Sequence, residues 1–215
     1  MKTVTTLLML ALAGAFSMAQ AQDVKGDVKA GEKKNAMCIG CHGIPGYQAS
    51  FPQVHRVPMI SGQNGKYIAA ALDAYRKGDR KHPSMRGIGA GLSDQDIADL
   101  AAFYEQHGRV ANAAKPPKAD IPVNLQAKLA SCVACHGENF SDTIDPANPR
   151  LAGQHADYLY VALRSYKGGN HVTGRNNATM AGMVTPLNDK DMKQIANFLG
   201  SLPGELKTVP QARTR

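Results

Sequence analysis

The chain contains one module written twice, and this duplication limits what it can fold into more than any other feature. The pentapeptide CIGCH at residues 38–42 recurs as CVACH at residues 132–136. The similarity continues downstream in two further pairs of segments: PMISGQNGKYIAAALDAYRKG from Pro58 with PRLAGQHADYLYVALRSYKGG from Pro149, and MRGIGAGLSDQDIADLAAFY from Met85 with MAGMVTPLNDKDMKQIANFL from Met180. Each copy has about 90 residues, a size at which a fold usually needs help beyond its apolar core.

A proline-rich stretch separates the two copies. Its sequence, AAKPPKADIP over residues 113–122, interrupts any helix and favours an extended, semi-rigid connection. We therefore predict a first module over residues 22–112, a linker over residues 113–123 and a second module over residues 124–215.

The first 21 residues have the pattern of an export signal. Lys2 supplies a positive start, residues 7–16 are apolar, and AQA at residues 19–21 matches a small-residue cleavage site. The apolar run is too short for a bilayer span, which needs about 20 residues. We expect cleavage near Ala21 and a mature protein in the bacterial periplasm.

Helical patterns dominate both copies. Ile68, Leu72 and Tyr75 recur at the spacing of one helix face. Ser93 and Asn188 stand at equivalent positions, and each has the side chain and the following acidic residues of a helix N-cap. No run is typical of a strand. We predict an all-α fold with two tandem domains.

The two pentapeptides admit four interpretations: covalent haem, zinc, a thiol redox couple or disulfides. Residues three apart on a helical turn share a face, so Cys38 and Cys41 can present both sulfurs to one edge of a haem. His42 can then turn its imidazole towards the iron. The second copy offers the same set: Cys132, Cys135 and His136.

The other three interpretations explain the pattern less well. Zinc would require a second pair about 15 to 20 residues away, whereas the two pairs here stand 94 residues apart. A thiol redox couple is typical of a βαβ pattern, and none is visible. Disulfides suit an exported chain but leave the histidine after each pair unexplained. We predict two covalently bound haem c groups, each filling the core of a module in a chain with no Trp.

The sixth ligand of each iron separates electron transfer from catalysis, because an open axial position binds or activates a molecule. Met85 and Met180 each stand seven residues before an equivalent leucine, so they share one place in the repeat. Met59 and Met183 have no methionine counterpart, and His82 aligns with an asparagine. We predict Met85 and Met180 as the sixth ligands, which favour the ferrous state and raise the reduction potential.

These motifs resemble the cytochrome c4 family, the di-haem c-type cytochromes of the bacterial periplasm. The resemblance lies in C-x-x-C-H, then Pro-x-x-x-Gly-Gln, then a methionine before a capped helix, all repeated twice. It implies two class I cytochrome c domains, each wrapped round its haem. It also implies that the carbonyls of Pro58 and Pro149 accept the Nδ1 protons of His42 and His136.

The same resemblance implies partners. Electrons would pass from a quinol-oxidising cytochrome bc complex, or a similar donor, to a terminal oxidase or reductase, with no small-molecule substrate. Two alternatives remain: a haem enzyme such as a di-haem peroxidase or thiosulfate-oxidising cytochrome, and an electron-accepting subunit of a dehydrogenase.

The charge of the chain is consistent with protein partners or a membrane surface. Without Lys2 the mature chain has 24 basic and 17 acidic residues, a net charge of +7, which four haem propionates would reduce to about +3. This charge could steer the protein weakly towards acidic surfaces or anionic lipid, as a peripheral contact. No nucleic-acid recognition motif is present.

Overall fold

The computed structural model of the protein describes residues 24–168 and 174–210. The signal sequence expected over residues 1–21 lies outside these ranges. The helices and strands are, in chain order, α1 (Val28–Lys34), α2 (Ala36–His42), β1 (Gln48–Ala49), β2 (His55–Arg56), α3 (Gly65–Lys77), α4 (Pro83–Ala90), α5 (Asp94–Gln106), α6 (Val123–His136), α7 (Ala156–Gly168), α8 (Ala178–Val184) and α9 (Asp189–Ser201). Of the described helices, none is long and apolar enough to cross a bilayer.

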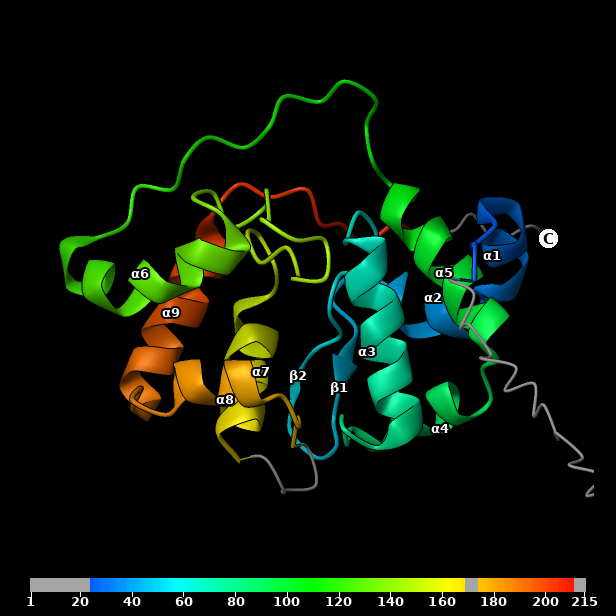
Figure 1. Ribbon diagram of the computed structural model, residues 1–215, viewed down its shortest axis with the longest axis horizontal. Helices are drawn as coiled ribbons and strands as arrows, with labels where there is room; N and C mark the ends of the chain where they lie inside the picture. The colour runs from blue at the N-terminus through cyan, green and yellow to red at the C-terminus, as the bar shows by residue number, and fades with distance from the viewer. Residues whose placement is uncertain (1–23, 169–173, 211–215) are drawn as a thin grey trace, which may run out of the picture.

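The two halves of the chain repeat the same order of helices and lie side by side (Figure 1). Helices α3, α4 and α5 of the first half correspond to α7, α8 and α9 of the second. The N-terminal helices differ, because α1 and α2 are separated at the buried Asn35 while α6 is one continuous helix of 14 residues. The predominantly helical structure confirms the predicted fold class.

One short antiparallel pair, β1 with β2, was not predicted. It lies in the loop between His42 and Pro58, which is three residues longer than the corresponding loop of the second half. Strands of two residues are too short to leave an alternating pattern in a sequence. The pair lies between α3 and α7 (Figure 1), and the backbone N–H of Arg56 donates to Asp157 at the start of α7 (2.9 Å).

The predicted N-caps are confirmed by their geometry. The Ser93 side chain accepts a hydrogen bond from the backbone N–H of Asp96, whose carboxylate accepts one from the backbone N–H of Ser93. Asn188 and Asp191 form the same reciprocal capping box at the start of α9. Each box satisfies N–H groups that the first turn of a helix leaves without an intrahelical partner.

A lysine four residues before the first cysteine of each pentapeptide ties the N-terminal helix to one of these capping boxes. Lys34 Nζ lies 2.7 Å from the Asp96 carboxylate, and Lys128 forms the equivalent ion pair with Asp191. Lys34 also binds the buried Asp99 carboxylate (2.7 Å). In each half, the segment that carries the cysteines is therefore attached to the last helix.

Each half has its own apolar core, built mainly from helix residues, to which the second half adds residues of its loops. The buried residues of the first core are Ile68, Leu100, Ala101, Phe103 and Tyr104. Those of the second are Ala119, Leu125, Leu129, Phe140, Ala152, Leu159, Val184, Leu187, Met192, Ile195, Ala196 and Leu199. Burying one large apolar side chain contributes about 1.5–3 kcal/mol, so the first core, which has fewer buried residues in the described chain, gains less from apolar burial than the second.

The chain crosses between the halves at two places in its described part. Residues 113–122 are non-helical and arch over the molecule in Figure 1, and Val123, predicted as the last linker residue, is the first residue of α6. After α9 the chain returns to the first half, where the backbone N–H of Lys207 donates to Ser61 O (3.0 Å). We call residues 202–210 the C-terminal strap. The module boundaries themselves stay a prediction.

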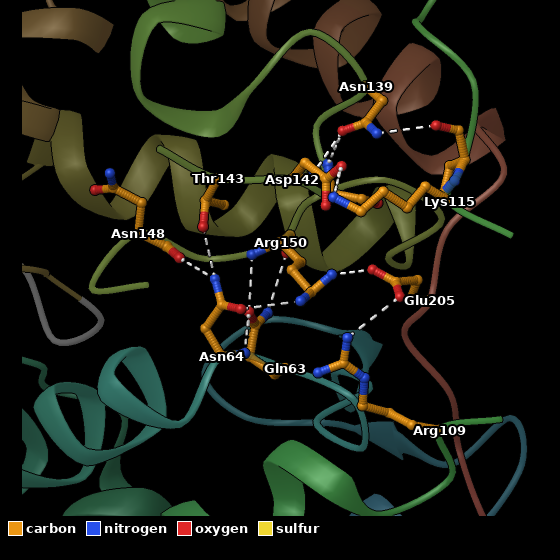
Figure 2. Close-up of polar contacts among 12 residues, drawn as sticks. Gln63, Asn64, Arg109, Lys115, Asn139, Asp142, Thr143, Asn148, Arg150 and Glu205 are labelled. Atoms are coloured by element: carbon orange, nitrogen blue, oxygen red, sulfur yellow. Dashed lines mark hydrogen bonds and ion pairs between the residues drawn. The ribbon is translucent and has the colours of Figure 1, made fainter. Parts of the chain in front are cut away.

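Polar side chains fill much of the contact between the halves (Figure 2). Arg150 Nε donates to Asn64 Oδ1 (3.0 Å), and the same guanidinium forms an ion pair with Glu205 of the C-terminal strap. Glu205 also lies 3.5 Å from Arg109 of the first half. Asn64 Nδ2 donates to the backbone carbonyl of Asn148 (2.8 Å). These contacts are directional, so they specify how the two halves dock as well as holding them together.

Candidate functional site

The cysteines and the following histidine of each pentapeptide lie at the C-terminal end of a helix. Cys38, Cys41 and His42 end α2, and the second set ends α6 in the same way: Cys132, Cys135 and His136. Burial raises the pKa of the Cys38 thiol, and burial also raises the pKa of the Cys132 thiol. Burial therefore favours the neutral thiol form of both sulfurs, which makes them poor nucleophiles for disulfide exchange.

Zinc and disulfide chemistry have no support in the geometry. Within residues 24–168 and 174–210, no three His, Cys, Asp or Glu side chains come together as a metal site would require. All four cysteines are free. The thiols are thus available for attachment to another group.

Each pentapeptide histidine is held by a backbone carbonyl. His42 Nδ1 lies 2.7 Å from Pro58 O, and His136 Nδ1 lies 2.9 Å from Pro149 O. With a carbonyl as acceptor, Nδ1 carries the proton, which leaves Nε2 with a free lone pair. Burial lowers the pKa of both imidazoles although the hydrogen bond opposes this effect, so both rings are neutral and suited to binding a metal.

The two methionines occupy one place in equivalent helices. Met85 is the third residue of α4 and Met180 is the third residue of α8, and both are partly buried. Met180 packs against the same core as Cys132. Met183, which has no methionine counterpart in the first half, is 41% exposed.

Two buried arginines that the motif analysis missed stand beside these groups in the sequence. Arg80 and Arg175 each lie five residues before one of the two methionines, and they are only 7% and 8% exposed. Their backbones pair as an antiparallel bridge between the halves. The position shared by the two copies was a signal that could have found them.

Tyrosines surround both guanidiniums. Arg80 Cζ lies 4.7 Å from the centre of the Tyr75 ring, and Arg175 Cζ lies 5.2 Å from that of Tyr166. The guanidiniums also donate to hydroxyl groups, Arg80 to Tyr67 (3.2 Å) and Arg175 to Tyr158 (3.1 Å). These four tyrosines are two of the residue pairs shared by the repeats.

Among the described residues, no carboxylate pairs with the arginine cluster. In the described part of the chain, neither guanidinium forms an ion pair with a carboxylate, and the buried Arg80 Nε and His82 Nδ1 atoms have no hydrogen-bond partner. Burial disfavours ionisation of Tyr158, yet Arg175 and Arg80 lower the pKa of its hydroxyl to about 8. Buried cations require an anionic partner.

The residues present therefore fit a haem in each half. Each half supplies two thiols on one helix, a neutral imidazole with a free Nε2, and a thioether. The two propionates of each haem would supply the negative charge that Arg80 and Arg175 lack.

Comparison with known proteins also indicates two c-type cytochrome domains. The family model described as cytochrome c matches residues 28–107 and again residues 126–203. Cytochrome c4 of Azotobacter vinelandii is 31% identical over 214 residues, which cover 93% of this chain and 97% of that protein. The crystal structure of reduced recombinant cytochrome c4 from Pseudomonas stutzeri superposes with a TM-score of 0.61 at 27% identity, covering 83% of this chain and all of that one. A protein named thiosulfate dehydrogenase electron acceptor, from Stutzerimonas stutzeri (strain A1501), is 28% identical over 77% of this chain and 78% of its own length.

Proposed function

The chain belongs to the cytochrome c4 family of di-haem electron-transfer proteins, and on this premise we propose that it carries electrons between redox proteins through two His/Met-ligated haems. One haem is attached through Cys38 and Cys41, with His42 and Met85 as its axial ligands. The second set is equivalent: Cys132, Cys135, His136 and Met180.

The observation that carries the proposal is the equivalence of the two halves. Each presents a histidine fixed through Nδ1 by a proline carbonyl, and each places a methionine third in the corresponding helix. When bound, each haem supplies a one-electron iron couple. The two cysteines would hold it covalently, and the histidine and the methionine would both bind its iron, which suits a carrier and would leave no open position for a substrate.

We propose that the protein acts in the periplasm, between a quinol-oxidising cytochrome bc complex or similar donor and a terminal oxidase or reductase. The export signal read in the sequence supports this location, and the thioether ligands support moderately high potentials late in an electron-transport chain. The similarity to a thiosulfate dehydrogenase electron acceptor supports a second candidate role, as the electron-accepting partner of a dehydrogenase.

Two spectra test the ligand set. The ferric protein should show the weak near-infrared band of methionine sulfur bound to ferric iron, with the intensity expected for two haems. Carbon monoxide should leave the spectrum of the reduced protein unchanged, because no axial position is open. A Met85→Ala variant should bind carbon monoxide at one haem and keep half of the near-infrared intensity. Carbon monoxide binding by the unmodified protein would instead indicate a haem enzyme.

The donor is tested separately. Purified thiosulfate dehydrogenase and a purified cytochrome bc complex can each be mixed with the oxidised protein and its reduction followed by stopped flow. Faster reduction by the bc complex supports the respiratory role, whereas faster reduction by the dehydrogenase supports the second candidate.

A further inference from the structure

Two equivalent glutamines reach across the interface to equivalent points of the opposite half. Gln154 accepts a hydrogen bond from the backbone N–H of Met59 (3.0 Å) and donates one to the carbonyl of Met59 (2.9 Å). Gln63 accepts a hydrogen bond from the backbone N–H of Arg150 (2.8 Å) and donates one to the backbone carbonyl of Arg150 (3.0 Å) (Figure 2). Each glutamine thus binds both backbone groups of one residue in the other half.

The residue held by Gln154 directly follows the proline that binds His42. Pro58 O accepts the hydrogen bond of His42 Nδ1, and the N–H of Met59 belongs to the same peptide unit. That unit is planar and trans, so its C=O and N–H point in opposite directions. A continuous line of hydrogen bonds therefore runs from Gln154 Oε1 through the peptide to His42.

The second half contains the mirror arrangement. Gln63 Oε1 accepts from the N–H of Arg150, the peptide unit continues to Pro149 O, and this carbonyl accepts from His136 Nδ1. The two lines cross the interface in opposite directions, since each begins on a glutamine of one half and ends on the histidine of the other.

Neither glutamine is free to turn. Gln63 is 4% exposed and Gln154 is 3% exposed. Each Oε1 also accepts the N–H of the next residue in its own chain segment, Asn64 at 2.9 Å and His155 at 3.0 Å. Both hydrogen-bonding ends of each amide are therefore used, and the orientation of the bound peptide is fixed with it.

We propose that Gln63 and Gln154 are positioning residues that control the axial histidine of the opposite half. An N–H that donates to an amide oxygen polarises its peptide, and the carbonyl at the other end becomes a stronger acceptor. A stronger acceptor at Nδ1 makes the imidazole a better electron donor to a metal, which stabilises the ferric state. The inference rests on the proposed function only in taking His42 and His136 as axial ligands.

The experiment replaces each glutamine by methionine, which has a similar length and forms no such hydrogen bonds. The reduction equilibrium of each haem is then measured in an NMR redox titration, with signals assigned from a Met85→Ala reference. Gln154→Met should raise the reduction equilibrium constant of the N-terminal haem about threefold to tenfold, or about 30–60 mV. Gln63→Met should act in the same way on the C-terminal haem.

A second readout follows the hydrogen bonds directly. Exchange of the His42 ring N–H with solvent should become faster in Gln154→Met, while that of His136 should stay as in the unmodified protein. The control is Asn64→Ala, which removes other hydrogen bonds across the same interface. The Asn64 side chain takes no part in the hydrogen bonds that lead from either glutamine to a histidine.

The crosswise pattern decides the outcome. Equal shifts at both haems, or a shift only in the half that carries the substitution, would overturn the proposal, because loosening the interface would explain either. If Gln154→Met does not fold, Gln154→Asn gives the same test with a shorter amide. If a glutamine variant keeps the near-infrared absorption of both haems but the haem of the opposite half does not shift, this inference alone is rejected. If the unmodified protein lacks that absorption, the proposed axial ligands are rejected.

Discussion

Arg80 and Arg175 lie opposite each other across the two halves, with their backbones bridged and both guanidiniums buried beside tyrosine rings. A positive charge held near an iron disfavours the ferric state, which carries one more positive charge than the ferrous state. Because we propose that the haem propionates lie beside these arginines, Arg80→Gln and Arg175→Gln should lower the reduction potential. An interaction of about 1 kcal/mol corresponds to about 40 mV.

Spectroelectrochemical titration measures this change, and Arg80→Lys and Arg175→Lys are the matched controls because they keep the charge. The lysine variants should stay closer to the potential of the unmodified protein than the glutamine variants do. If the lysine and glutamine variants lower the reduction potential equally, hydrogen bonding by the guanidinium, and not its charge, sets the potential.

The C-terminal strap should hold the halves together through Glu205. Its carboxylate pairs with Arg150 and lies 3.5 Å from Arg109, and burial lowers the pKa of Arg150. Glu205→Gln leaves Arg150 partly buried without its anionic partner, which should cost about 1–2 kcal/mol in the free energy of unfolding. We expect a lower first transition in calorimetry, with the two halves unfolding in separate steps.

The control for Glu205 is an exposed pair of the same chemistry. Lys118 and Glu138 lie 2.9 Å apart, with side chains 71% and 64% exposed. Glu138→Gln should change stability by less than about 0.5 kcal/mol, since exposed pairs contribute little. A Glu205→Gln protein that unfolds like the Glu138→Gln protein would show that the strap does not depend on this carboxylate.

The features predicted from the sequence are those encoded over short distances. The capping boxes at Ser93 and Asn188 depend on residues three apart, and a repeated pattern marked the helices that carry Met85 and Met180. The break at Asn35 and the short strands had no such pattern to reveal them.

The arginine cluster and the glutamine contacts depend on residues far apart in the chain. Gln63 was visible as a position shared by the two copies, but its partner at Arg150 is 87 residues away. A repeat shows that two positions are equivalent. It does not show that each copy contacts the other, because the docking of the halves is a property of the folded surfaces.

Asp99 should make stability depend on acid pH. This carboxylate is 2% exposed and accepts from Lys34 Nζ (2.7 Å), Asp27 N (2.8 Å) and Gln95 Nε2 (2.8 Å). The hydrogen bond from Lys34 is the largest cause that lowers the pKa of Asp99, although burial opposes it. The folded-state pKa of Asp99 therefore lies below its unfolded value of about 3.9. The carboxylate stabilises the protein at pH values above about 3.9, and this stabilisation is lost as the pH falls through the folded-state pKa.

The comparison for Asp99 is the Asp99→Asn variant, unfolded in urea between pH 7 and pH 3. At pH 7 the variant should be less stable by about 1.5–3 kcal/mol, the usual contribution of hydrogen bonds to a charged group. The difference should shrink below about pH 4, as the unmodified carboxylate loses its advantage. A difference that stays constant down to pH 3 would assign the effect to packing and not to charge.

Gly31 allows α1 to pack directly on α5. A Cβ atom at this buried position would stand 2.1 Å from Asp99 O and 2.7 Å from Phe103 Cβ, and helix backbone cannot move aside at low cost. Gly31→Ala should therefore separate the helices and destabilise the first half by about 1–3 kcal/mol.

Gly40 is the matched control, because a Cβ there meets no atom of the described residues within 4 Å and the second copy already has Ala134 at that position. Gly40→Ala should be neutral or stabilise by up to about 1 kcal/mol, since alanine loses less backbone entropy in a helix. Urea unfolding of both variants measures the difference, and equal midpoints would show that α1 can shift to accept a side chain.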